Sequence, residues 1–176
     1  MSEVERIIHK HCVEWRLDGQ RHREDGPAVE SLNGNRRWYR HGQLHREDGP
    51  AIEGVSGYKA WYLNGKLHRE DGPAIENVNG TNEWWYYGKR HRNDGPAIEC
   101  DNGTKKWYRY GKKHRVDGPA VEYANGVRKW YRVGKLHRKD GPAIEYAYGR
   151  KYWYFEGTKY SYKEWMVKVM KSRKDD

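Results

Sequence analysis

Apolar and polar positions recur along this chain with a fixed period of 23 residues. Trp stands at positions 15, 38, 61, 84, 107, 130 and 153, and every Pro keeps one distance from it, at 27, 50, 73, 96, 119 and 142. The shared pattern is W-Y-x-x-G-x-x-H-R-x-D-G-P-A-[IV]-E-x-x-x-G-x-x-x. A period between about 20 and 50 residues predicts supersecondary units that stack on one another.

Short alternating runs on both sides of an Asn-Gly pair predict a β-hairpin in each repeat. Asn125-Gly126 is one such pair, and Asn-Gly suits a two-residue type I′ turn because both positions need positive φ. This turn would place Val121 opposite Trp130 and Glu122 opposite Lys129. We therefore expect Ile or Val beside each Trp on one face of the sheet, and Tyr, Ala and Glu on the opposite face.

A second Gly, four residues after each Trp, predicts a second turn. In Asn64-Gly65 this turn would place His68 across from Trp61. The following H-R-x-D-G-P-A segment predicts a bend, because Pro cannot donate to a strand ladder and Asp before Gly favours a turn. Arg and Asp two residues apart can pair inside this bend. The sequence thus predicts an all-β fold, a repetitive antiparallel β-meander of stacked 23-residue hairpins.

The two ends of the chain depart from the repeat, as expected for the ends of a repeat array. Residues 1–12 form the expected N-terminal cap, where 6–9 match the phase of a strand and Ser2-x-x-Glu5 allows a short helix instead. Residues 13–160 form six to seven repeats. Residues 161–176 are expected to be a C-terminal capping helix and tail.

The C-terminal segment carries its own helix signals. Ser161 and Glu164 have the spacing of a capping box. Trp165, Met166, Val169 and Met170 follow at positions that would share one apolar helix face. We expect this helix to fold over the last hairpin.

Composition supports a folded chain with many half-exposed rings. Hydrophobic residues make up 35% and charged residues 34%, a balance that is typical of disorder, but 9 Trp and 15 Tyr argue against it. Rings with a polar group suit partly exposed positions. The chain contains no long apolar run and no signal-peptide pattern near its N-terminus. With only Cys12 and Cys100, we expect a reducing compartment, the cytoplasm.

The repeated His and Asp residues are interpreted as structural. An active site needs one asymmetric arrangement, whereas these residues recur in every repeat. Equivalent His in adjacent repeats would lie two strands, or about 10 Å, apart, too far for shared zinc coordination. We therefore expect no catalytic residue, no metal and no cofactor. The residues assigned to the repeat structure are Trp38, Trp61, Trp84, Trp107, Trp130, His45, His68, His91, His114, His137, Asp48, Asp71, Asp94, Asp117 and Asp140.

Charge is the feature that varies between repeats. Residues 1–100 carry 15 Lys and Arg against 16 Asp and Glu, whereas residues 101–152 carry 14 against 5. The basic residues of the fifth and sixth repeats are therefore candidates for partner binding: Lys105, Lys106, Arg109, Lys112, Lys113, Arg128, Lys129, Arg132 and Lys135. The alternative is that they only solubilise a long sheet and protect its edges.

Arg109 and Arg132 are the strongest of these candidates. Each stands two residues after a Trp, which places it on the Trp face of the predicted sheet. The two would lie one repeat, or about 10 Å, apart. Arg beside Tyr and Trp on an open sheet is typical of a surface that binds anions or nucleic acid.

The repeat resembles the MORN repeat, which is also a 23-residue β-hairpin. Asn64-Gly65-Lys66-Leu67-His68 is similar to the MORN run N-G-K-x-H. The segment from His68 to Ala74 departs from MORN and resembles a W-Y-x-x-G-x-x-H-R-x-D-G-P-A variety encoded by tailed bacteriophages and large DNA viruses. The resemblance implies a scaffold or a membrane-associated module.

We therefore expect a non-enzymatic scaffold or binding module that presents an extended β surface to a macromolecular partner. The viral resemblance implies a host-cell cytoplasm and a host defence component as that partner. One alternative is binding of nucleic acid or a nucleotide signal by the basic repeats. Another is peripheral binding to acidic membranes.

Overall fold

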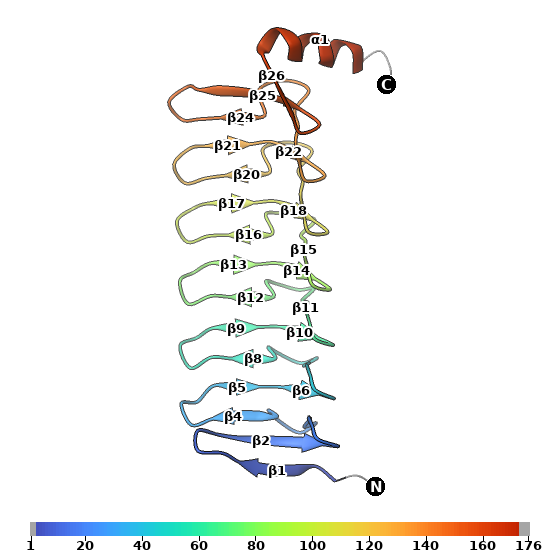
Figure 1. Ribbon diagram of the computed structural model, residues 1–176. Helices are drawn as coiled ribbons and strands as arrows, with labels where there is room; N and C mark the ends of the chain where they lie inside the picture. Colours follow the sequence, from blue (N-terminus) through green and yellow to red (C-terminus); the bar gives the residue numbers. More distant parts are fainter. Residues whose placement is uncertain (1–2, 173–176) are drawn as a thin grey trace. The chain divides into compact units, whose positions relative to one another are not determined.

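The computed structural model describes residues 3–172. Contacts along the chain divide it into two compact units, residues 1–89 and residues 90–176. Figure 1 labels the helix and most of their strands, numbered in chain order. Each unit is an antiparallel arrangement of successive hairpins, as the sequence predicted.

In the first unit, the main sheet places its strands in sequence order apart from the short hairpins and β3, which pairs with β2. Its strands are β1 (Glu5–Ile8), β2 (Cys12–Leu17), β3 (Gln20–Arg21), β4 (Val29–Ser31), β5 (Arg36–Arg37), β8 (Ile52–Glu53), β9 (Lys59–Ala60), β12 (Ile75–Glu76) and β13 (Asn82–Glu83). Beside it lie β6 (Tyr39–Arg40), β7 (Gln43–Leu44), β10 (Tyr62–Leu63), β11 (Lys66–Leu67) and β14 (Trp85–Tyr86). The boundary between the two units along the chain falls within β15 (Lys89–Arg90).

The second unit repeats this order and ends in a helix. Its main-sheet strands are β16 (Ile98–Glu99), β17 (Lys105–Lys106), β20 (Val121–Glu122), β21 (Arg128–Lys129), β24 (Ile144–Glu145), β25 (Lys151–Phe155) and β26 (Thr158–Tyr160). Its short hairpins are formed by β18 (Tyr108–Arg109) with β19 (Lys112–Lys113), and by β22 (Tyr131–Arg132) with β23 (Lys135–Leu136). The helix is α1 (Tyr162–Ser172).

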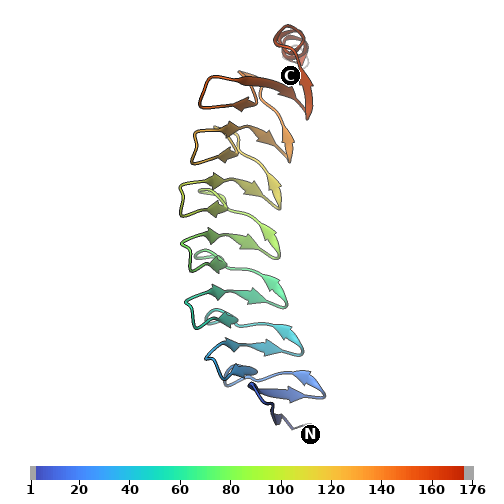
Figure 2. The same cartoon turned by 60° about the vertical axis from the view of Figure 1, so that its left-hand side comes forward.

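Each repeat has two parts, a long hairpin in the main sheet and a short hairpin set off from it (Figure 2). Hydrogen bonds link both parts to the next repeat. In the main sheet, β17 pairs with β16 and with β20. Among the short hairpins, the Gly134 N–H donates to the Lys113 carbonyl at 2.8 Å. Two parallel sets of hydrogen bonds therefore join consecutive repeats within a unit.

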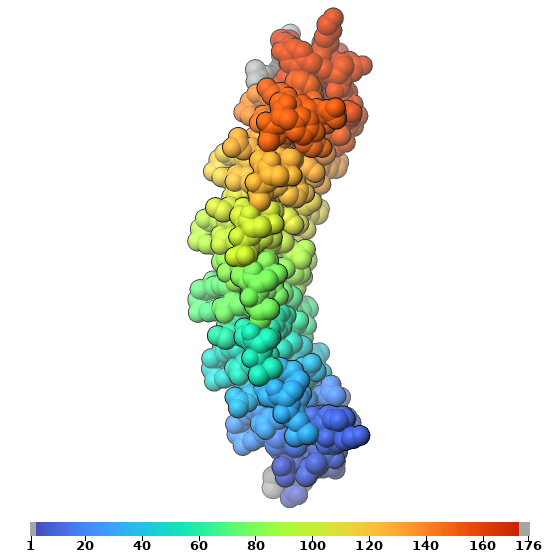
Figure 3. Space-filling model, turned by 90° about the vertical axis from the view of Figure 1, so that its left-hand side faces the viewer, coloured from blue at the N-terminus to red at the C-terminus, as the bar shows by residue number. Residues whose placement is uncertain are grey.

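The long hairpin does not close through the predicted two-residue turn. The Tyr123 N–H donates to the Val127 carbonyl, and the Gly126 N–H donates to the Tyr123 carbonyl, both at 2.9 Å. Three residues therefore form the loop, and Gly126 has a φ of 81° whereas Asn125 is not in the left-handed region. This is a type I turn followed by a glycine bulge, which accepts the same Asn-Gly sequence. In Figure 3 these turns face the viewer.

This turn shifts the register by one residue and corrects the predicted faces. Val121 lies opposite Lys129, and Glu122 lies opposite Arg128. Because side chains alternate along a strand, the shift moves Ile and Val away from the Trp face and brings Glu onto it. Trp107 is instead hydrogen-bonded to Ala120, whose side chain is fully buried.

The short hairpin closes as predicted. In Tyr62–Leu67 both turn residues have positive φ, 49° at Asn64 and 72° at Gly65, which defines a type I′ turn. The His68 N–H donates to the Trp61 carbonyl at 3.1 Å, so these two residues face each other as expected. The first turn position varies among repeats, and Val133 occupies it with a φ of 48°.

The core of the repeats consists mainly of small side chains. The Ala of every D-G-P-A bend is fully buried, and Val121 and Ile98 are buried beside it on the main sheet. The repeat Trp residues are half-buried. The narrow space between consecutive bends explains why Ala recurs where the neighbouring position varies between Ile and Val.

The N-terminal end is closed by a strand and not by a helix. Strand β1 pairs with β2 along its whole length, with Arg6 opposite Trp15 and Ile8 opposite Val13. Of the two interpretations of this segment, the degenerate strand is therefore correct. Ser2, which would have started the alternative helix, lies outside the described residues.

The C-terminal helix α1 packs on the last hairpin, as predicted. Ser161 and Glu164 form the reciprocal hydrogen bonds of a capping box. Trp165 and Val169 are buried against Phe155. Met170 is 56% exposed, so the predicted apolar face is narrower than expected because this residue lies at its edge. Positions 173–176 of the expected tail lie outside the described residues. No helix within residues 3–172 has the length and apolar character required to span a membrane.

Candidate functional site

The Arg of each H-R-x-D motif joins the parts of its repeat. In the fifth repeat, the Arg115 guanidinium lies 4.0 Å above the Trp107 ring. It also donates to Asp117 at 3.3 Å and to Glu122 at 2.9 Å. The predicted Arg–Asp pair is therefore present, and the Glu of the next strand completes it. Because the guanidinium covers one face of the indole, that face is closed to ligands.

The His of each motif holds the short hairpin of the next repeat. The Tyr110 N–H donates to Nδ1 of His91 at 3.3 Å, and the Tyr110 and His91 rings stack with their centroids 4.2 Å apart. Because a backbone N–H can only donate, Nδ1 carries the lone pair and the ring is neutral. The same bond recurs at 19-residue separation for His22, His45, His68, His114 and His137.

Both contacts lie on the Trp face, which carries Trp107, Arg109, His114 and Arg115 in the fifth repeat. A groove of about 460 Å³ crosses it between two bends. The groove is lined by Arg92, Asn93, Asp94, Gly95, Trp107, Tyr108, Arg109, His114, Arg115, Val116 and Asp117. The first unit has an equivalent groove around Trp38.

The charge of the groove differs between the two units. Around Trp38, three Arg face four carboxylates, since Glu24 and Glu47 accompany the Asp residues of the bends. Around Trp107, three Arg face only the two Asp residues. The difference arises at the variable residue of H-R-x-D, which is Glu47 in the second repeat and Val116 in the fifth.

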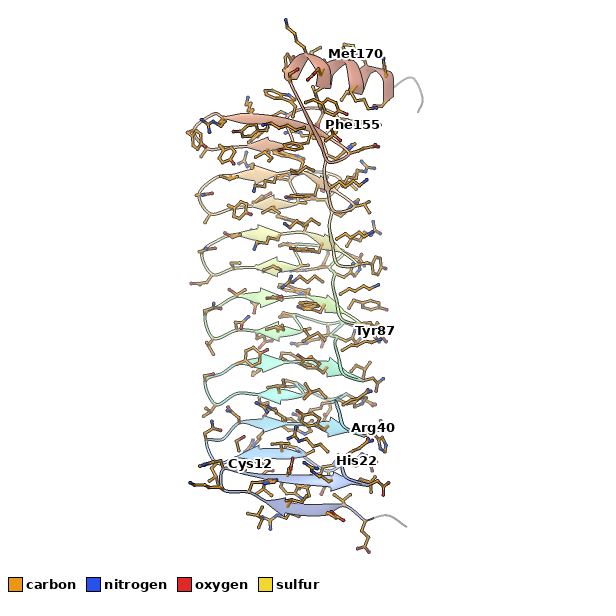
Figure 4. The ribbon with its side chains drawn as sticks, in the orientation of Figure 1. Cys12, His22, Arg40, Tyr87, Phe155 and Met170 are labelled. Atoms are coloured by element: carbon orange, nitrogen blue, oxygen red, sulfur yellow. The ribbon has the colours of Figure 1, made fainter. Side chains whose placement is uncertain are left out.

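This substitution changes the surroundings of the Arg two residues after Trp. Arg40 lies 3.6 Å from Glu47, which neutralises it. Arg109 occupies the same position beside Val116, and it makes no ion pair with any residue in 3–172. Figure 4 shows Arg40 on the side of the first unit where the short hairpins lie. Arg109 is therefore an exposed cation in a groove where its counterpart is paired.

Six of the nine predicted basic residues share the Trp face. Arg109 lies opposite Lys112, and Arg132 lies opposite Lys135, on consecutive short hairpins. All four side chains are exposed. Lys105 and Arg128, on the main sheet, lie opposite the repeat Glu residues.

Electrostatics place Arg109 and Arg132 near the same histidine. Burial lowers the pKa of the His114 imidazole, and the guanidinium groups of Arg132 and Arg109 lower it further. Burial together with Arg109 also lowers the pKa of His91. Both arginines therefore act on the electrostatics of one histidine, His114.

The remaining three basic residues point to the opposite face. Lys106 lies opposite Ile98 and Val121, and Lys129 lies opposite Val121 and Ile144. The Lys113 ammonium lies 5.0 Å from the centre of the Tyr131 ring. Each of these three residues comes directly after a Trp-face residue in its strand, and neighbouring side chains in a strand point to opposite faces. The structure therefore separates them from the other six candidates.

A buried carboxylate near the N-terminus is not predicted by the repeat pattern. Glu14 is only 2% exposed and accepts hydrogen bonds from Arg21 and Arg16, each at 2.8 Å, while His9 lies 2.7 Å away. The bond from Arg21 is the main cause that lowers the pKa of Glu14 to about 2. His9 is thus part of the hydrogen-bonded cluster around Glu14. The sequence gives little signal for this burial, because Glu83 also precedes a repeat Trp and is only half-buried.

Cys12 and Cys100 are both free thiols, and Figure 4 shows Cys12 near the turns of the long hairpins. Within residues 3–172, no three His, Cys, Asp or Glu side chains are arranged to hold a metal ion.

Comparison with protein-family models and with curated proteins gives no match to this chain.

Proposed function

We propose that this chain is a non-enzymatic repeat binding module whose Trp face, in the second unit, binds an acidic segment of a partner protein. The observation that carries this proposal is the difference between the surroundings of Arg109 and those of Arg40. Arg40 has a carboxylate at 3.6 Å, whereas Val116 replaces that carboxylate beside Arg109. Arg132 likewise has Lys139 at the equivalent position.

The covered Trp rings favour a protein partner over single-stranded nucleic acid. Binding of single strands combines a basic groove with aromatic rings on which bases stack. Here the guanidinium groups of Arg115 and Arg138 lie 4.0 and 3.9 Å above Trp107 and Trp130. The strongest stacking surfaces of the groove are therefore occupied from within the protein.

The resemblance to viral MORN-like repeats adds a cellular location and a partner class to this proposal. A repeat of that variety would act in the cytoplasm of a host cell, and a host defence component is then the partner class. The repeated His, Arg and Asp residues are assigned to the repeat scaffold, because each contacts a residue at a fixed distance along the chain.

A capture experiment with matched variants tests the proposed function. The full chain, Arg109→Glu with Arg132→Glu, and Arg40→Glu would each be incubated with lysate of the proposed host cells, with and without nuclease. We expect a partner that survives nuclease, is lost by the double variant and is retained by Arg40→Glu. Loss of the partner in both variants, or in neither, would contradict the proposal.

Two control measurements identify the alternatives. Capture that disappears after nuclease would assign the surface to nucleic acid. Co-sedimentation with anionic vesicles, but not with neutral ones, would assign it to an acidic membrane.

A further inference from the structure

We propose that the segment bound by the second unit adopts a polyproline II conformation and carries an acidic side chain at every third residue. This inference rests on the proposed function and specifies the partner. It is drawn from the spacing of cations on the short hairpins and from the carboxylates that line the groove beside Arg109.

The cations come in cross-strand pairs. Arg109 lies directly opposite Lys112, and Arg132 lies directly opposite Lys135. Like charges at directly opposite positions destabilise a hairpin. The equivalent pair in the second repeat, Arg40 and Gln43, avoids this cost. Two consecutive hairpins therefore each hold an unfavourable pair that one carboxylate could bridge, which would lower the repulsion between the two cations.

The two pairs are separated by one repeat. The short hairpins form a continuous set of strands, because Gly134 N–H bonds to the Lys113 carbonyl and Arg115 N–H bonds to the Tyr131 carbonyl. Each repeat contributes two strands to this set. Neighbouring strands lie about 4.8 Å apart, so equivalent cations in consecutive repeats lie about 9.6 Å apart.

A polyproline II segment matches this distance and direction. It has three residues per turn and rises about 3.1 Å per residue, so every third side chain points the same way at intervals of about 9.3 Å. A β-strand repeats one face every two residues, at about 6.6 Å, and does not match. An α-helix approaches the distance only at residues seven apart, about 10.5 Å.

The exposed carboxylates of the groove disfavour a continuous polyanion. Asp94 and Asp117 line the same groove as Arg109, and their side chains are 82% and 83% exposed. A ligand with a negative charge at every unit would bring some of its charges against these Asp residues. A segment with two uncharged residues between successive carboxylates would avoid this repulsion. The order of charges on the surface therefore favours spaced acidic side chains over a phosphodiester chain.

Synthetic peptides test the spacing directly. Proline-rich peptides with two Glu residues and identical composition would differ only in the separation of the Glu residues, two, three or four positions. Fluorescence anisotropy with the full chain would measure the affinities. We expect the peptide of spacing three to bind about fivefold more tightly than the others, since only it engages both cation pairs. A helix-forming peptide with Glu residues seven apart and an oligothymidylate would be measured in parallel.

Matched variants connect the result to the site. The preference for spacing three should disappear in Arg109→Gln with Arg132→Gln and persist in Arg40→Gln. Equal affinities for all spacings, or tighter binding of the helical peptide or of oligothymidylate, would overturn the inference. If the peptide result fails in this way but capture still yields a nuclease-resistant partner that depends on Arg109 and Arg132, the proposed function stands. If the capture experiment fails as well, both the inference and the proposed function are overturned.

Discussion

The backbone N–H of Val133 donates a 3.1 Å hydrogen bond to Nδ1 of His114, in the preceding repeat. A protonated Nδ1 cannot accept this bond. Burial and nearby Arg side chains lower the pKa values of His91, His114 and His137. Each of these contacts therefore depends on the neutral imidazole.

Acid should weaken the second unit through these histidines. The pKa of each of these histidines is lower in the folded protein than in the unfolded chain, where it is about 6.5. As the pH falls below about 6.5, the unfolded chain therefore binds more protons than the folded protein. Stability is thus complete above this pH and is lost as the pH approaches the lowered native value. Urea unfolding between pH 7.5 and 5 would measure the loss.

His114→Asn is the informative variant for this effect. The Asn Oδ1 can accept from Val133 N–H but does not titrate, so we expect a smaller loss of stability in acid and little change at pH 7.5. His114→Ala should cost about 1 kcal/mol at pH 7.5, because it removes the acceptor. An acid sensitivity that is unchanged in His114→Asn would show that this contact is not responsible.

Replacing a bend Ala by a slightly larger residue should destabilise the protein. Ala120 has no exposed surface and lies beside Trp107. Ala120→Val should cost about 1–3 kcal/mol by overpacking, measured by urea unfolding. Ala124→Val adds the same two methyl groups at an exposed turn of the same repeat and should change stability by less than about 0.5 kcal/mol. Equal effects of the two would mean that the space beside Trp107 is not closely packed.

Relieving the strained turn of the sixth repeat should stabilise it. Val133 is a β-branched residue in the left-handed region, where its side chain is crowded. Val133→Asn should raise stability by about 1 kcal/mol while keeping the N–H bond to His114. The reverse change, Glu156→Val at the same position of the next hairpin, should lower stability by a similar amount. A loss of stability in Val133→Asn would indicate that the Val side chain makes a favourable contact.

Replacing a repeat Arg by Lys should not be conservative. Arg138 lies 3.9 Å above Trp130 and donates to Asp140 at 2.9 Å and Glu145 at 2.8 Å. The Lys ammonium cannot make these contacts together, so Arg138→Lys should cost about 1–2 kcal/mol. Arg128→Lys, at an exposed position, is the control and should be nearly neutral. Thermal unfolding of both variants would check this difference, and equal midpoints would contradict it.

The period and the turn chemistry made the hairpin repeat predictable from sequence. Trp61 and His68 face each other because a two-residue turn at Asn64-Gly65 leaves one possible register. The position of Arg109 on the Trp face also follows from alternation along a short strand. Both are local relationships, and local spacing determines them.

The register of the long hairpin was not predictable from Asn-Gly alone. Both turn types accept Asn125-Gly126, and they differ only in whether Asn has positive φ. The recurring Ala favours the observed register, since an Ala that never varies indicates a closely packed position. The bond between His114 and Val133, 19 residues apart, was also missed, because nothing in the spacing indicates which short hairpin a His would contact.

The contacts that define a repeat have short reach along the chain. Arg138 contacts residues two, four and seven positions ahead, and His137 reaches 19 positions to Glu156. A tandem duplication of one 23-residue segment would therefore preserve every partner at its required distance. The number of repeats can change during evolution without redesign of any side chain, and each added copy would lengthen the Trp face by one more short hairpin.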